Sequence, residues 1–180
     1  MIATARLIKK NHLDSMVIFV GPCTAKKSEI KKPNLAKSVD YVLTFEEISA
    51  LFDAFEIDFS NCSDLPVSDA TLSARGFAQS GGVSNAIALA AKEIGIDLKP
   101  IKINGQSELK KTLLLAKAGK LDGNFIEGMM CEGGCLDGPA VLWSSRKTAV
   151  PFKTFSQKSE GKSPFDNKIL EEFKDVNLNR

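Results

Sequence analysis

The residues best suited to chemistry are two cysteines four positions apart in a glycine-rich stretch. Cys131 and Cys135 lie within residues 127–139, which read Glu-Gly-Met-Met-Cys-Glu-Gly-Gly-Cys-Leu-Asp-Gly-Pro. Glycines leave backbone N–H groups accessible, and the sulfides of an inorganic cluster accept hydrogen bonds from such groups. The stretch therefore suits a metal or an iron–sulfur cluster, although a glycine-rich loop with two incidental buried thiols accounts for it equally well.

A third cysteine stands at the end of a predicted strand. Cys23 follows the apolar run 16–20 and lies in Gly-Pro-Cys-Thr-Ala-Lys-Lys-Ser-Glu, residues 21–29. Open α/β sheets bind ligands in the loops at the carboxyl ends of their strands. Lys26 could present an ammonium group to an anion there and Thr24 a hydroxyl, but an exposed turn with solubilising lysines is the alternative. The glycine spacing of a phosphate-binding Walker loop is absent.

Composition excludes several classes of function. The 180 residues carry a net charge of +2 and show no basic stripe interleaved with aromatics, so nucleic acid is not an expected partner. No apolar run is long enough to span a membrane, and we identify no signal peptide, so we expect a cytoplasmic protein. Disulfides are then not expected, and for the four cysteines metal, cluster or catalytic use competes with plain burial. With His12 as the only histidine, we expect neither a Ser-His-Asp mechanism nor a histidine-rich zinc site.

Helices and strands are predicted to alternate along the chain. The predicted strands are 16–20, 41–43, 100–103 and 124–127, and the predicted helices are 3–11, a helix capped by Thr44 and Glu47, 84–94, 107–118 and one that begins at 163. This order predicts an α/β fold with a mostly parallel four-stranded sheet flanked by helices, in a single lobe over residues 1–180. The loops after the first and last strands would share one edge, so Cys23 could meet Cys131 and Cys135.

The segments between these elements give weaker signals. Residues 58–80, which include Cys62, are predicted to be an irregular substrate-side loop or insertion. Gly81 and Gly82 open a helix whose N-terminus could accept an anion, although glycines that permit close packing explain them as well. Residues 139–144 are expected to start a helix and 152–162 to form a loop. The expected apolar faces consist of Ile48, Leu51, Phe52 and Phe55 in one helix and Ile169, Leu170 and Phe173 in the last.

Three converging thiolates would suit zinc or an iron–sulfur cluster. Structural zinc sites prefer two residues between paired cysteines, whereas Cys131 and Cys135 have three between them. A fourth ligand would have to come from Cys62 or from outside this chain.

Two motifs resemble those of a known family. Residues 21–29 resemble the second cluster motif of the iron-only (di-iron) hydrogenases, and residues 127–135 resemble the third. The intervening segments 41–44 and 80–83 occur in the order that family uses. The resemblance covers nearly the whole chain and points to the C-terminal part of the catalytic H-cluster domain of the large subunit.

The resemblance implies a cofactor and roles for five residues. The family's H-cluster is a 4Fe–4S cubane that a cysteine sulfur joins to a two-iron unit carrying CO and cyanide. Cys23, Cys131 and Cys135 match three of the four cubane ligands, and Cys135 matches the bridging one. Lys26 matches a lysine that hydrogen-bonds a cyanide, where a cation suits the chemistry. Met129 matches a methionine packed beside the two-iron unit.

The chain also departs from the family pattern. The first motif, Thr-Ser-Cys-Cys-Pro, is absent, and we expect it in an N-terminal lobe of the same protein, of which this chain would be a fragment, natural or engineered. Gly21 replaces a methionine, and Gly138 and Pro139 replace a longer glycine run. Both changes resemble the sensory branch of the family. Cys62 matches no ligand and is interpreted as structural or incidental.

We therefore expect a fragment of a hydrogenase that interconverts H₂ with protons and electrons, with ferredoxin or a signalling module as partner. We expect the isolated chain to be inactive and to carry no cluster. Three alternatives stay open: a redox- or hydrogen-sensing domain, a non-catalytic iron–sulfur scaffold related to hydrogenases, and a zinc or simple thiol protein.

Overall fold

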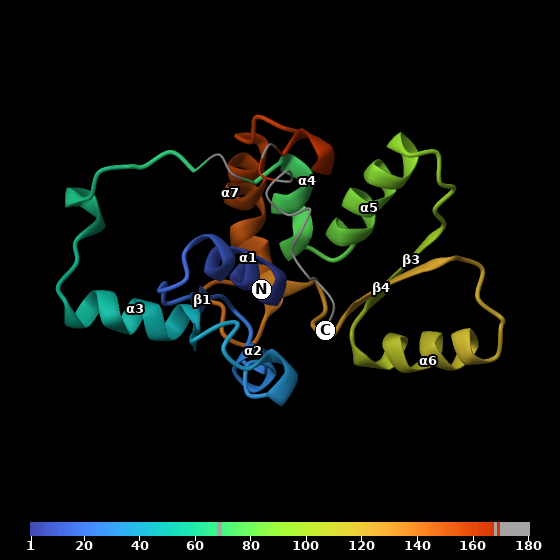
Figure 1. Ribbon diagram of the computed structural model, residues 1–180, viewed down its shortest axis with the longest axis horizontal. Helices are drawn as coiled ribbons and strands as arrows, with labels where there is room; N and C mark the ends of the chain where they lie inside the picture. The colour runs from blue at the N-terminus through green and yellow to red at the C-terminus, as the bar shows by residue number, and fades with distance from the viewer. Residues whose placement is uncertain (68–69, 168, 170–180) are drawn as a thin grey trace. The chain divides into compact units, whose positions relative to one another are not determined.

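The computed structural model describes residues 1–67, 70–167 and 169, and the chain divides into two compact units (Figure 1). The first unit contains residues 1–65 and 139–142, and the second contains 66–138 and 143–168. Each unit contains one pair of parallel strands with helices, so the predicted α/β class with parallel strands is confirmed. The prediction that residues 1–180 make a single lobe stays a prediction.

The predicted parallel strands are present as one pair in each unit, and the joining of all four strands in a single sheet stays a prediction. Among the described residues, β1 (Ile18–Val20) pairs only with β2 (Tyr41–Leu43), and β3 (Pro100–Asn104) pairs only with β4 (Phe125–Met129). Alternating helices and strands predict parallel crossovers, which both pairs have, but they do not determine which strands share hydrogen bonds.

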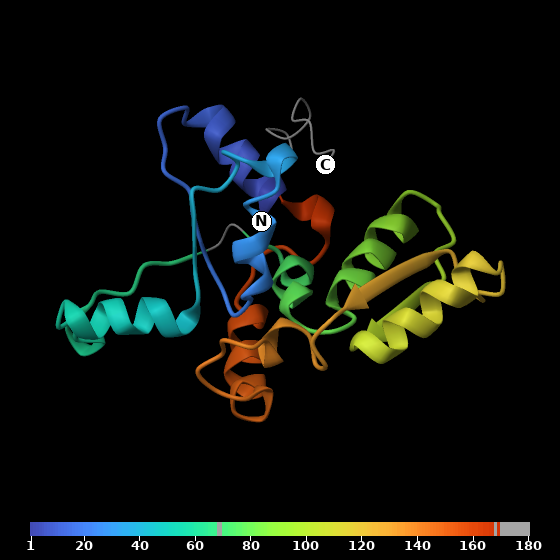
Figure 2. The same ribbon diagram turned by 90° about the horizontal axis from the view of Figure 1, so that it is seen from below.

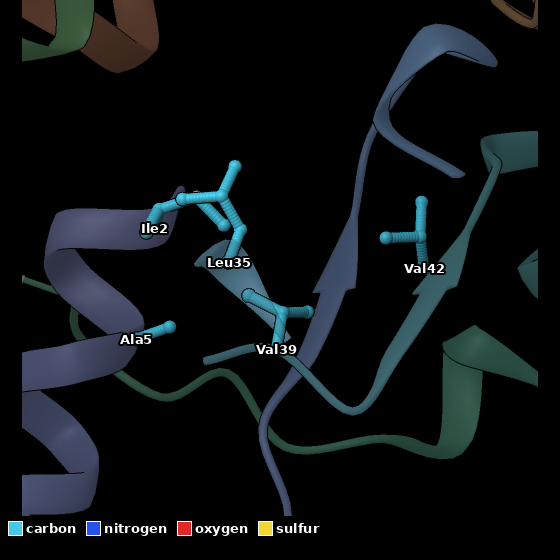
Figure 3. Close-up of a cluster of buried hydrophobic side chains, with 5 residues drawn as sticks. All are labelled: Ile2, Ala5, Leu35, Val39 and Val42. Carbon is cyan, nitrogen blue, oxygen red and sulfur yellow. The ribbon is translucent and has the colours of Figure 1, made fainter. Parts of the chain in front are cut away.

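The core of the first unit lies between α1 and the β1–β2 pair. Ile2 and Ala5 of α1 (Ile2–Asn11) are buried together with Leu35, Val39 and Val42 (Figure 3). The unit also contains α2 (Ala25–Glu29), α3 (Phe45–Ala54) and the short 3₁₀ turns η1 (Pro33–Leu35) and η2 (Phe59–Asn61). The helix expected at 3–11 is therefore confirmed as α1.

The first strand is not the buried strand that its apolar run predicts. Phe19 packs against the core, but its neighbours Ile18 and Val20 are 48% and 41% exposed. Side chains alternate between the two faces of a strand, and only the face that carries Phe19 is covered within this unit. A continuous apolar run alone does not reveal whether one face or both will be covered.

The predicted capping box at the start of α3 is present. The Thr44 hydroxyl accepts a hydrogen bond from the Glu47 N–H at 3.2 Å, and Thr44 N–H donates to Glu47 Oε2 at 2.8 Å. The apolar face of this helix is nevertheless open, because Leu51 is 41% and Phe55 74% exposed. Local hydrogen bonds at the first turn thus define where the helix begins. No other described part of this unit covers the exposed Leu51 and Phe55 side chains.

In the second unit, two helices enclose the β3–β4 pair. α5 (Gly82–Glu93) and α6 (Gln106–Lys117) lie on opposite sides of the pair, as Figure 1 and the turned view in Figure 2 show. Ile103 of β3 is fully buried. The remaining elements are α4 (Leu72–Arg75), η3 (Gly76–Ala78), η4 (Cys135–Asp137), α7 (Ser145–Gln157) and η5 (Pro164–Asp166).

The end of the second unit corrects one prediction. α7 starts after Ser144, as the expected start near 139–144 implies, but it extends to Gln157 and so includes the first part of the segment 152–162 that was predicted as a loop. Pro151 lies inside this helix. Proline lacks an N–H and usually interrupts a helix interior, yet this helix continues past it.

Other predictions for the second unit hold in part. The start at Ser163 is confirmed as the 3₁₀ turn η5, whose capping box joins Ser163 and Asp166. Leu170 and Phe173 lie outside the described residues. Residues 58–80 are irregular apart from η2, α4 and η3. None of the helices in the described part of the chain is long and apolar enough to cross a membrane.

Candidate functional site

Glycines shape the loop that follows β4. We call residues 130–135 the cysteine loop. Gly133 and Gly134 adopt φ values of +83° and +84°, which side chains other than hydrogen rarely tolerate. The Gly134 N–H donates to the Cys131 carbonyl at 3.1 Å, so the two cysteines bracket a tight turn. Cys131 and Cys135 are both half-buried.

The segment that leads into α5 lies against this loop. We call residues 79–84 the α5 entry segment. Gln79 and Gly134 form an antiparallel bridge, and the Ser80 N–H donates to the Gly133 carbonyl at 3.4 Å. A Cβ atom on Gly134 would lie 2.6 Å from the Ser80 nitrogen. The glycines therefore serve close backbone contact as well as turn formation.

The anion at the N-terminus of α5 comes from the chain itself. Glu127 of β4 is 5% exposed, and its Oε1 and Oε2 accept hydrogen bonds from Gly81 N–H at 3.0 Å and Ser84 N–H at 2.9 Å. The packing explanation holds too, because a Cβ on Gly82 would lie 1.9 Å from the Gly76 carbonyl oxygen. Sequence reasoning missed Glu127, although a charged residue in an otherwise apolar strand was a usable signal.

A second carboxylate fixes the exit from the loop. Asp137 Oδ1 accepts a hydrogen bond from the Ser145 N–H at 2.9 Å at the start of α7. Hydrogen bonds from Ser145 hold the pKa of Asp137 below its ordinary value. The charged carboxylate therefore suits the positive end of the helix.

Cys23 and Lys26 belong to the first unit. Cys23 is half-buried between β1 and α2. Lys26 lies within α2 rather than in the predicted loop, and its Nζ forms an ion pair with Glu29 Oε2 at 2.5 Å. Neighbouring Lys27 forms an ion pair with Glu47 and lowers the pKa of that carboxyl.

The remaining predicted residues are placed as follows. Met129 ends β4, is half-buried, and its carbonyl accepts the Gly105 N–H at 2.8 Å. Cys62 is exposed in the irregular segment, where its Sγ lies 3.5 Å from the Asp58 carbonyl oxygen.

The structure brings two of the three predicted cysteine ligands together, and the position of the third relative to them stays a prediction. Cys131 and Cys135 share one loop of the second unit, whereas Cys23 belongs to the first, so convergence of all three stays a prediction. The Pro22 carbonyl accepts a hydrogen bond from Ala140 N–H at 3.2 Å, and Ala140 lies in the segment that returns from η4 to the first unit. Among the described residues, no three His, Cys, Asp or Glu side chains form a group that could hold a metal ion.

The donor set fits an iron–sulfur cluster. All four cysteines are described, and none forms a disulfide. Cys23, Cys131 and Cys135 are half-buried, so their sulfurs combine partial access with protection from water. Thiolates in glycine-rich loops are the usual ligands of such clusters.

Comparisons with known proteins give relatives of one kind. The periplasmic [Fe] hydrogenase large subunit of Nitratidesulfovibrio vulgaris (strain Hildenborough) is 28% identical over 175 aligned positions, which cover 74% of this chain and 42% of that protein. Among solved structures, a variant of the [FeFe]-hydrogenase HydA1 from Chlamydomonas reinhardtii is 18% identical, with a TM-score of 0.66 over 100% of this chain and 64% of that one.

A second solved structure has a similar fold. It is a [FeFe]-hydrogenase studied for oxygen damage to the 2Fe subcluster of its H cluster, and it is 18% identical, with a TM-score of 0.65 over 99% of this chain and 63% of that one. The chain thus spans less than half the length of the curated relative and less than two thirds of these structures. Residues 1–139 match the C-terminal domain of the iron-only hydrogenase large subunit, and the chain belongs to that family.

Proposed function

We propose that this chain is the part of an iron-only hydrogenase catalytic domain that supplies three of the four cubane ligands of an H-cluster. The observation that carries the proposal is the family match over residues 1–139, which includes Cys23, Cys131 and Cys135. The half-buried state of all three thiols supports it. The proposed activity of the whole protein is the reversible oxidation of H₂ to protons and electrons.

Each proposed residue has a physical role. Cys23, Cys131 and Cys135 would hold the cubane as thiolates, and Cys135 would also bridge to the two-iron unit. The bound H-cluster supplies the redox chemistry. Lys26 would present its ammonium to the anionic cyanide, a contact favoured between opposite charges. In this chain the Lys26 ammonium forms an ion pair with Glu29. Met129, half-buried at the end of β4, would pack against the two-iron unit.

The rest of the protein would complete the site. The family's cubane has four protein ligands, and this chain offers three matching cysteines. We propose that the fourth comes from an N-terminal lobe of the same protein, and that ferredoxin or a signalling module exchanges electrons with it. We therefore propose that the isolated chain is inactive and contains no cluster when purified without added iron. We propose a cytoplasmic location.

Reconstitution tests the cofactor proposal. The full chain is incubated with ferrous iron and sulfide under anaerobic conditions, and the visible absorbance of the cluster and the iron bound per chain are measured. Substitution of Cys23, Cys131 or Cys135 by serine should each remove most of the absorbance, because each removes one thiolate. Cys62→Ser is the matched control and should retain it. Equal absorbance in all four variants would refute the ligand assignment.

A sensory role is the second candidate function. It is favoured by two departures from the catalytic motifs, Gly21 and the pair Gly138–Pro139. Gly21 is buried, and a Cβ there would lie 2.8 Å from the Phe19 ring, so this chain has no room for a larger side chain without rearrangement. Hydrogen evolution by the complete protein with a reduced viologen dye separates the two functions: fast turnover indicates the enzyme, and bound cluster with negligible turnover indicates the sensor or a non-catalytic scaffold.

A further inference from the structure

Two parts of the second unit that are distant in sequence are tied together around the cysteine loop. Before the loop, the Glu127 carboxylate binds the Gly81 and Ser84 N–H groups of the α5 entry segment. At the far end of the loop, Gly133 and Gly134 bind the same segment through Ser80 and Gln79. The loop is therefore held by the α5 entry segment on both sides of Cys131.

Of the contacts just described with the α5 entry segment, only those of Glu127 use a side chain. Burial and two hydrogen bonds fix the position of that side chain. It is 5% exposed, and each of its oxygens accepts one backbone N–H. A carboxylate is favoured at the N-terminus of a helix such as the twelve-residue α5. Without it, the buried Gly81 and Ser84 N–H groups would lose their acceptor, which is costly in a site that water does not reach.

We propose that Glu127 is a positioning residue for Cys131 and Cys135. By fixing the end of β4 to the α5 entry segment, it holds the cysteine loop in its turn before any metal binds. The inference rests on the proposed function only for what the two thiolates hold. Side chains that orient metal ligands in this indirect way commonly change metal affinity when they are replaced.

The variant Glu127→Gln keeps the size of the side chain and changes one group. Its amide retains one oxygen acceptor but presents NH₂ toward the second backbone N–H, so one of the two hydrogen bonds must break. Asp166→Asn is the matched control, because Asp166 also accepts two backbone N–H groups, from Lys162 and Ser163, away from the cysteine loop.

Cobalt serves as the probe of the thiolates. The reduced full chain is titrated with Co²⁺ without oxygen, and the thiolate-to-cobalt absorbance gives the dissociation constant. We expect Glu127→Gln to bind Co²⁺ about 10-fold or more weakly than the parent chain, and Asp166→Asn to bind like the parent. Equal affinity in Glu127→Gln and the parent would overturn the inference. If Cys131→Ser does not change the parent's absorbance, the proposed function fails instead.

Amide hydrogen exchange in the metal-free chain decides the inference independently. We expect the amide of Ser80, which donates to the Gly133 carbonyl, and the amide of Gly134, which donates to the Cys131 carbonyl, to exchange at least several-fold faster in Glu127→Gln and at the parent rate in Asp166→Asn. Unchanged exchange in Glu127→Gln would overturn the inference even if cobalt does not bind. Should Glu127→Gln fail to fold, the parent chain still gives an answer: the amides of Ser80, Ser84 and Gly134 must open together, and separate opening would refute the tie.

Discussion

At the scale of single residues, Gly134 is the position where conformation and space are both restricted. Its φ is +84°, and a Cβ would lie 2.6 Å from the Ser80 nitrogen and 2.8 Å from the Ala78 carbonyl oxygen. Gly119 makes a good comparison, because its φ is +66° but nothing lies within 4 Å of a Cβ there. The two glycines thus separate the cost of a left-handed backbone from the cost of crowding.

We predict that Gly134→Ala lowers the free energy of unfolding more than Gly119→Ala does. A left-handed conformation costs alanine about 1–2 kcal/mol, and displacement of packed backbone typically adds a further ~1–3 kcal/mol. Only Gly134→Ala has both the conformational cost and the crowding cost, and it should also weaken the backbone bridge to Gln79. Urea unfolding of both variants measures the difference, and equal losses would show that the α5 entry segment can move aside.

The site was predictable from sequence only as far as its thiols and its glycines. The motifs around Cys23, Cys131 and Cys135 point to the cluster, because spacing and residue type are local properties. Glu127 was missed, since its partners Gly81 and Ser84 are more than forty residues away in sequence. Which distant N–H groups a buried carboxylate finds depends on how α5 packs on β4, and a one-dimensional pattern does not contain that packing.

At the scale of elements, α3 begins where its sequence dictates. Thr44 and Glu47 exchange hydrogen bonds across the first turn, and the Thr44 residue is 5% exposed. We predict that Thr44→Ala lowers the free energy of unfolding by about 1 kcal/mol, because one helix N–H loses its acceptor. Thr44→Ser keeps the hydroxyl and should cost much less. Chemical denaturation measures both, and a loss in Thr44→Ser as large as in Thr44→Ala would contradict the capping role.

α7 carries a proline in its interior. Pro151 is exposed in the helix Ser145–Gln157, so its ring contributes little packing there, and it has no N–H for the hydrogen bond to the preceding turn. We predict that Pro151→Ala raises the free energy of unfolding by roughly 1–3 kcal/mol. Val150→Ala, at a neighbouring side chain that is 75% exposed, is the control and should change stability little. A destabilised Pro151→Ala would mean that the proline serves packing outside this unit.

The elements also show which features of the fold a sequence can predict. The starts of α3 and η5 follow from capping residues that act within one turn, and both are confirmed. The burial of β1 and of the α3 apolar face depends on a second layer, and Ile18 and Phe55 are exposed where burial was expected. The part of α7 after residue 151 was predicted as a loop, but Phe155 packs there against Arg75, whose guanidinium carbon lies 4.2 Å from the ring centre, and a contact across 80 residues is not visible in a local pattern.

At the scale of the whole molecule, the chain exposes apolar side chains in both of its units. Phe55, Phe59 and Leu65 in the first and Trp143 and Val150 in the second are all more than half exposed. The chain covers 42% of the curated relative's length. We propose these side chains as candidates for contact with another lobe of the same protein.

The response of both units to acid follows from their carboxyl groups. Five of the described carboxyls have a pKa below the ordinary value: Asp40, Glu47 and Asp58 in the first unit, and Asp137 and Asp166 in the second. In each case the largest cause is a hydrogen bond that the carboxylate accepts, from Lys9, Lys27, Ser60, Ser145 and Ser163 in that order. The folded chain therefore binds protons at these sites less readily than the unfolded chain does.

This difference determines the direction of the pH dependence. Above the ordinary values of 3.8 for Asp and 4.5 for Glu, the five carboxylates are charged in both states and their stabilising contribution is complete. As the pH falls through the lowered values, the unfolded chain takes up more protons than the folded chain, so stability must decrease. We predict that the thermal midpoint at fixed ionic strength falls between about pH 5 and pH 3, and that Asp137→Asn, which cannot titrate at that position, loses less over the same interval. A thermal midpoint that stays level or rises toward pH 3 would mean that these hydrogen bonds do not persist in solution. The hydrogen bond of Asp137 at the exit of the cysteine loop would then be absent as well.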